Sequence, residues 1–138
     1  MATTQRSFRL KPATLELLDE HAREAGISAN ALTQRLLDES LRVEHHPLIR
    51  FREGGSGTRF PALVGRRLSV WDVMGTVWVE GGDIAATAEY LQISQRDIQA
   101  CVDYYADFRE EVDAYGAEQE AAAERVHRQL ERRRAAVG

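Results

Sequence analysis

Few side chains of this 138-residue chain have a spacing that would support catalysis or metal binding. His45 and His46 are adjacent, but no second pair of ligands follows at a spacing typical of a metal site. The run Gly54–Gly57 lacks the lysine of a phosphate-binding loop and is typical of a hairpin turn. No Ser/His/Asp or Cys/His set is ordered as an activated nucleophile would require. We therefore expect no enzyme, no cofactor and no metal site.

The polar side chains best suited to recognition alternate along a short segment near the N-terminus. Side chains of a β-strand point to opposite faces in turn, so Gln5, Ser7 and Arg9 share one face. Phe8 and Leu10 share the other face. A lone strand leaves its backbone N–H and C=O groups unpaired. We therefore expect the segment to pair with the same segment of a second copy, which two-fold symmetry allows.

Two amphipathic helices are expected to follow this strand. Pro12 opens the first helix, where its missing N–H costs nothing, and Gly26 ends it. Ser28 can cap the second helix, which contributes about 1 kcal/mol. Each helix carries one apolar stripe. The stripes consist of Leu15, Leu17, Leu18, Ala22 and Ala25 in the first helix and Ala29, Leu32, Leu36 and Leu37 in the second.

The strand and the two helices together resemble the ribbon-helix-helix DNA-binding domains of the Arc, MetJ and CopG type. The matching features are the strand QRSFRL, the proline that opens the first helix and the turn GISAN. The resemblance implies a homodimer whose two strands enter the major groove of double-stranded operator DNA. It assigns base contacts to Gln5, Ser7 and Arg9, and phosphate binding to Ser28 and Asn30. The alternative is a strand and helix pair that only dimerises.

Charge is unevenly distributed along the chain, whose net charge is −4. Residues 1–43 are neutral, residues 44–68 carry +3, residues 69–119 carry −9 and residues 120–138 carry +2. Phosphates repel an acidic surface, so the segment 69–119 is expected to bind a partner other than DNA. The chain has one cysteine and no apolar run that could be a signal core or a membrane span. We expect a soluble, cytoplasmic protein.

Residues 44–68 are expected to form a β-hairpin linker. Pro47 prevents the preceding helix from continuing. Ile49 and Phe51 are strand formers, and Arg59–Val64 can return as a second strand after the glycine-rich turn.

A helix-turn-helix pattern occupies residues 69–115. A first helix capped by Ser69 carries Trp71 and Trp78, and Asp83 and Ser94 can cap two further helices. The motifs VWDV, DIAATAEYL and IS make this part resemble the small winged-helix-like domain of VapB-like bacterial antitoxins.

The helix after Ser94 carries one arginine and two aspartates over residues 94–103, so we expect it to bind protein and not DNA. Trp71, Trp78 and Cys101 are expected in the core.

The last segment, residues 116–138, is expected to be a charged helical tail that Gly116 separates from the preceding helix. Its apolar stripe is too thin to fold alone. The antitoxin resemblance implies that this region binds a PIN-like ribonuclease toxin, whose metal site is a carboxylate cluster that arginine could pair with. The expected partner-binding residues are Val112, Tyr115, Val126, Leu130, Arg128, Arg132, Arg133 and Arg134. The alternative is a solvated, frayed tail.

The expected fold is mainly α with short β. It consists of a ribbon-helix-helix domain (1–43), a β-hairpin linker (44–68), a winged-helix-like helix-turn-helix domain (69–115) and a C-terminal helical tail (116–138). The expected function is that of an antitoxin which represses its own operon as a homodimer and neutralises a toxin. The alternative is a stand-alone ribbon-helix-helix transcriptional repressor with no toxin partner.

Overall fold

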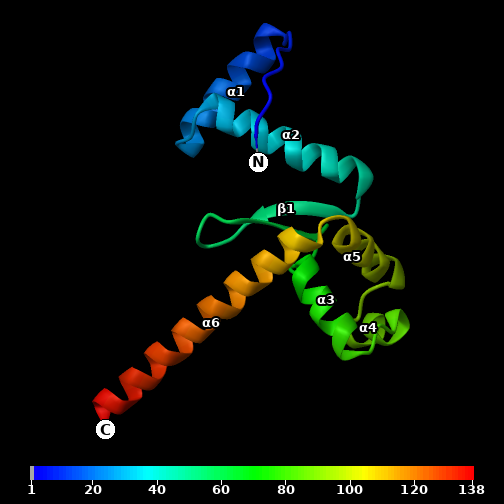
Figure 1. Cartoon of the computed structure of the whole chain (residues 1–138), viewed down its shortest axis with the longest axis vertical. Helices are drawn as coiled ribbons and strands as arrows, with labels where there is room; N and C mark the ends of the chain where they lie inside the picture. The colour runs from blue at the N-terminus through cyan, green and yellow to red at the C-terminus, as the bar shows by residue number, and fades with distance from the viewer. Residues whose placement is uncertain (1) are drawn as a thin grey trace. The chain divides into compact units, whose positions relative to one another are not determined.

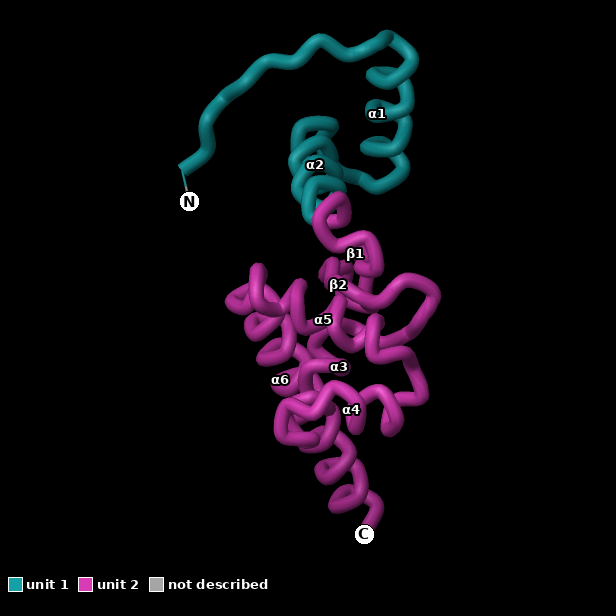
Figure 2. Tube along the Cα trace, turned by 90° about the vertical axis from the view of Figure 1, so that its right-hand side faces the viewer, with its two compact units in different colours: residues 1–42 teal, residues 43–138 magenta. Residues whose placement is uncertain are grey.

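The computed structural model of the chain describes residues 2–138 and divides into two compact units (Figure 2). Unit 1 comprises residues 1–42 and unit 2 comprises residues 43–138. Helices dominate, and the described strands form one two-stranded antiparallel sheet (Figure 1). The prediction of a mainly α chain with short β-structure is therefore confirmed.

Unit 1 begins with residues 2–11, which form neither helix nor strand in the single chain. Helix α1 (Pro12–Ala25) starts at its proline and ends at Gly26, whose left-handed conformation (φ 69°) suits a residue without a Cβ. The N–H of Ile27 donates to the carbonyl of Ala22 at 3.1 Å, which closes this helix end. The predicted start and end of the first helix are confirmed.

Helix α2 (Ala29–His45) is the second helix of unit 1, and its last residues belong to unit 2. The Ser28 hydroxyl accepts a hydrogen bond from the N–H of Ala31 at 3.0 Å, as the predicted cap requires. The sequence placed the end of the ribbon-helix-helix domain at residue 43, and its last helix runs slightly further, to His45. Helical backbone persists to His45 because only the residue directly before Pro47 is excluded from it by proline sterics.

The β-hairpin of unit 2 consists of β1 (Ile49–Glu53) and β2 (Arg59–Leu63), in the antiparallel register that pairs Ile49 with Leu63. The N–H of Gly54 donates to the carbonyl of Thr58 at 2.8 Å and closes the turn. The predicted hairpin is confirmed, and its buried ends anchor it in the core of unit 2.

Three short helices follow, and each begins at a predicted capping residue. In α3 (Val70–Val79) the Asp72 N–H donates to the Ser69 hydroxyl and the Ser69 N–H donates to the Asp72 carboxylate, both at 3.0 Å. Asp83 caps α4 (Ile84–Leu91), and Ser94 caps α5 (Gln95–Asp107). These helices, the hairpin and the start of α6 share one hydrophobic core, which consists of Ile49, Leu63, Val70, Val73, Met74, Val77, Ala88, Ile93, Ile98, Cys101, Tyr104 and Val112.

Helix α6 (Arg109–Val137) is continuous, and within unit 2 its second half extends away from α3–α5 (Figure 1). The expectation that Gly116 interrupts this helix is wrong. Gly116 is buried, and a Cβ built on it would lie 2.3 Å from Cε2 of Trp71. Glycine stands here because the Trp71 ring packs directly on the helix backbone, and a glycine inside a helix costs only about 1 kcal/mol relative to alanine.

We expect Gly116→Ala to lower the free energy of unfolding by about 1–3 kcal/mol, because the added methyl group would overpack the Trp71 contact. The matched control is Gly75→Ala in α3, where an added Cβ meets no described atom within 4 Å. The control should raise stability by about 0.5–1 kcal/mol through helix propensity. Urea unfolding followed by circular dichroism measures both changes. Equal stability of the two variants would contradict the packing role of Gly116.

Candidate nucleic-acid and protein interfaces

Unit 1 buries almost none of its own apolar side chains. Among residues 2–42 only Ala22 and Leu32 are buried. The large apolar side chains that remain exposed are Phe8, Leu10, Leu15, Leu17, Ile27, Leu36, Leu37 and Leu41. We call this set the unit 1 apolar surface. A segment of this length that leaves most of its leucines exposed to water buries too little apolar surface to form a core of its own.

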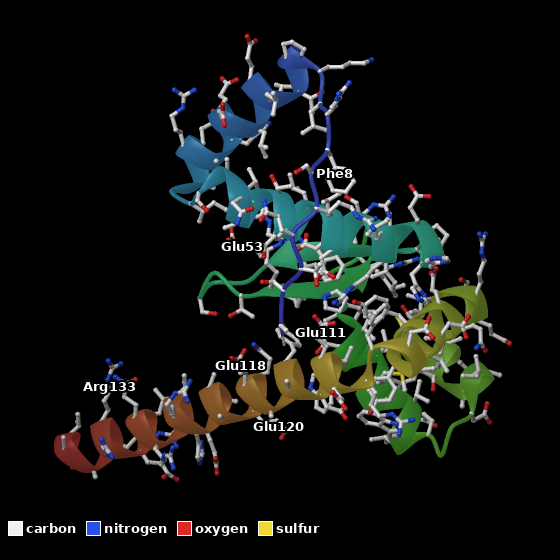
Figure 3. The ribbon with its side chains drawn as sticks, turned by 45° about the horizontal axis from the view of Figure 1, so that its top comes forward. Phe8, Glu53, Glu111, Glu118, Glu120 and Arg133 are labelled. Carbon is white, nitrogen blue, oxygen red and sulfur yellow. The ribbon has the colours of Figure 1, made fainter. Side chains whose placement is uncertain are left out.

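The predicted base-contact residues lie on the segment before α1. Gln5, Ser7 and Arg9 are all exposed there. Phe8, labelled in Figure 3, projects from the same segment and is 67% exposed. The segment has no ladder partner among the described residues, which leaves its backbone groups open to pairing.

The residues predicted to contact phosphate lie at the start of α2. Ser28 precedes α2, and Asn30 is in its first turn; both are exposed. No acidic residue stands in the first turn of this helix, so no carboxylate competes there with an anion. Backbone N–H groups at a helix start are the chemistry that phosphate binding requires.

Helix α5, which the sequence predicts to be the second helix of a helix-turn-helix, carries charges of both signs. On α5, the carboxylate of Asp97 lies 4.0 Å from the Arg66 guanidinium, and the amide of Gln99 donates to Asp103 at 2.9 Å. Arg96 is the exposed cation on the same turns. These groups do not form the cationic stripe that a DNA recognition helix presents.

Two of the expected partner-binding residues at the start of α6 instead pack within unit 2. Val112 is 1% exposed and belongs to the core, so the expectation that it contacts a partner is corrected. Tyr115 is half-buried and stacks on Phe60 of β2, with ring centroids 5.0 Å apart. Burial, together with the nearby carboxylates of Asp72 and Glu118, raises the pKa of the Tyr115 hydroxyl. An apolar stripe on a helix has the same appearance whether its partner is foreign or part of the same chain.

The second half of α6 is exposed. Val126 and Leu130 are 56% and 46% exposed and share one helix face at i, i+4 spacing. The arginines expected to bind a partner are exposed on the last turns, and Arg133 points into solvent (Figure 3). These arginines are Arg128, Arg132, Arg133 and Arg134.

An aromatic groove on unit 2 was missed by sequence reasoning. Trp78 was expected in the core, but it is 46% exposed, while Tyr90 is 72% exposed. With Trp71, Glu80 and Glu120 they line a depression of about 510 Å³ between α3, α4 and α6. The sequence did contain a signal: Val70, Val73, Met74 and Val77 complete the buried face of α3, and Trp71 and Trp78, seven residues apart, fall on the neighbouring face.

Cys101 and His46 are both buried within unit 2. Cys101 is buried as predicted, and burial raises the pKa of its thiol to about 12, so the reactive thiolate is scarce at neutral pH. The His46 ring hydrogen-bonds to Asp107 at 2.9 Å and packs edge-on against Tyr104.

No group of three or more His, Cys, Asp or Glu side chains among residues 2–138 could hold a metal ion. No helix in this range combines the length and apolar character of a membrane span.

Comparisons of the chain with protein-family models, curated protein sequences and solved structures gave no match.

Proposed function

We propose that the chain is a cytoplasmic antitoxin of a bacterial type II toxin–antitoxin pair. In this proposal it represses its own operon as a DNA-bound homodimer and neutralises a PIN-like ribonuclease toxin through unit 2. The proposal rests mainly on the unit 1 apolar surface, which a second copy of the chain would bury in a dimer. Unit 1 is then a ribbon-helix-helix domain, and unit 2 is a winged-helix-like module with a partner-binding helix.

The dimer follows from burial and from hydrogen bonding. Fully burying one leucine or phenylalanine side chain stabilises by about 1.5–3 kcal/mol, and unit 1 has eight large apolar side chains available for burial in each copy. Two antiparallel copies of the segment before α1 would also satisfy each other's backbone groups. The Nε of Arg35 is shielded from solvent without a hydrogen-bond partner among the described residues, and a second copy could supply an acceptor.

DNA binding follows from the polar face of the paired segments. Arginine reads guanine and glutamine reads adenine by bidentate hydrogen bonds in the major groove, so Arg9 and Gln5 suit base contacts. Ser28 and Asn30 would hold a phosphate at the start of α2 and fix the register of the ribbon on the duplex. A two-fold symmetric dimer would read a palindromic operator.

Toxin binding is assigned to the exposed surfaces of unit 2. Val126 and Leu130 form a narrow apolar face on a helix that has few other contacts along its second half. The arginines beyond Val126 could form bidentate pairs with the carboxylates of a nuclease site and exclude its metal. The exposed aromatic rings of Trp78 and Tyr90 have no role in DNA binding by unit 1, and aromatic side chains are enriched in protein interfaces.

The dimer is tested by Phe8→Ala, which removes an apolar anchor from both copies. We expect the dissociation constant to rise at least tenfold, since the loss is about 1.5–3 kcal/mol per buried ring. Sedimentation equilibrium at micromolar concentration measures it. The control is Val79→Ala, which removes an apolar side chain of unit 2 that is 83% exposed and should leave the dimer intact. A monomeric wild-type chain at these concentrations would refute the dimer.

The groove assignment is tested by Arg9→Ala. We expect this change to leave the dimer intact and to weaken operator binding by about 1–3 kcal/mol per half-site, because one base contact is lost. The control is Arg6→Ala, which removes the same charge from the opposite face of the predicted strand and should keep the discrimination between operator and random DNA. Fluorescence anisotropy titrations at several salt concentrations measure both variants. Operator affinity of Arg9→Ala equal to that of the wild type would contradict the assignment.

Toxin neutralisation is tested by co-expression with the gene adjacent to the chain's own gene. We expect the double change Val126→Lys/Leu130→Lys to abolish growth rescue while DNA binding is kept, because it places two charges on the proposed contact face. The control is Ala135→Lys on the same helix, where the side chain is exposed and points about 180° away from Val126 around the helix axis. If neither the wild type nor any variant rescues growth, the chain acts instead as a stand-alone repressor.

A further inference from the structure

Arginines converge on one surface depression of unit 2, apart from every residue assigned to DNA or toxin binding above. The depression has a volume of about 400 Å³ and lies beside β1, at the place where β2 ends at Leu63. Arg50 and Arg52 of β1 line it together with Arg66 and Arg67 of the turn that follows β2. We propose that this arginine pocket binds a phosphate of a nucleic-acid backbone, which gives the chain a nucleic-acid contact beyond the proposed DNA-binding unit.

Two of the arginines are held in place by the backbone of unit 2. The Arg52 guanidinium donates to the carbonyl of Arg66 at 2.8 Å, which ties β1 to the turn. The Arg50 guanidinium donates to the carbonyls of Pro47 and Ile49 at 3.1 and 2.9 Å. Backbone carbonyls hold both guanidinium groups, so no carboxylate of the described chain neutralises their charge. Each group also keeps further N–H donors that an anion could accept from. A pre-organised fork of donors loses little conformational freedom when an oxyanion binds.

The pocket has an excess of positive charge. Arg66 lies 4.0 Å from Asp97, which is a long ion pair at a partly exposed site and contributes little. Arg67 is exposed and has no ion-pair partner among residues 2–138. Four like charges around one depression repel each other, and an anion between them would relieve that repulsion.

The chemistry favours a phosphodiester backbone over an acidic protein segment. Protein interfaces have a core enriched in aromatic and apolar side chains, whereas the only large apolar side chain exposed at this pocket is Val64. The lining also contains no aromatic ring on which a base could stack. A pocket with these groups can recognise phosphate but not a base, so it would bind without sequence preference.

The test uses the full chain and the double change Arg66→Ala/Arg67→Ala. Binding to a random-sequence DNA duplex and to a single-stranded RNA is measured by anisotropy between 50 and 200 mM salt. If two phosphate contacts are lost, the slope of log K against log salt should fall in magnitude by about 1.8 on the duplex or by about 1.4 on the single strand. The control, Arg96→Ala/Arg125→Ala, removes two exposed arginines elsewhere and should keep the wild-type slope on both probes.

The outcomes separate this proposal from the proposed function. A reduced slope on one probe or both supports the pocket and identifies the nucleic acid that it binds. Equal slopes for the two double variants overturn it. It is also overturned if the Arg66/Arg67 variant loses affinity for a polyglutamate peptide while its nucleic-acid binding is unchanged. The same titrations in an Arg9→Ala background should show an additive loss, so a failure of DNA binding by unit 1 would leave the effect of Arg66 and Arg67 measurable.

Discussion

The packing of the Trp71 ring on the backbone of Gly116 is the contact on which the arrangement of unit 2 depends. It holds the first two turns of α6 against α3, close enough for Tyr115 to stack on Phe60 of the hairpin. The Trp71 ring also packs edge-on against the Trp78 ring, with ring centroids 5.5 Å apart. The aromatic groove therefore exists because α6 begins in the core and leaves it. No large side chain beyond Gly116 has a comparable contact, so the rest of the helix remains free for a partner.

Local features of the fold could be predicted from the sequence, and features set by tertiary contacts could not. The caps at Ser69, Asp83 and Ser94 act within three residues of themselves, so the helix starts were predicted correctly. Gly116 was misread because nothing near it in the sequence indicates that a tryptophan 45 positions earlier packs on it. The same reason explains Val112, whose apolar spacing is the same for a core contact as for a foreign one.

The candidate interfaces likewise include residues that the sequence could indicate and surfaces that only tertiary contacts create. Gln5, Ser7 and Arg9 are exposed, but Phe8 and Leu10 are exposed as well and the segment is not a strand in the single chain, so the predicted alternation of two faces stays a prediction. The base contacts assigned to them require a second copy and a duplex, and they stay predictions. The aromatic groove and the arginine pocket combine residues from separate elements, and only the folded chain brings them together.

Unit 2 has two exposed surfaces of different character, the cationic arginine pocket and the apolar face of Val126 and Leu130 on α6. Phosphate binding releases condensed counterions and weakens steeply with salt, whereas a contact centred on apolar side chains does not. Raising the salt concentration should therefore release nucleic acid from the arginine pocket well before it releases a protein held at Val126 and Leu130. Under the two proposals, one compact unit of this chain would offer a cationic pocket to nucleic acid and an apolar helix face to a protein, and the two contacts would depend on different physical forces.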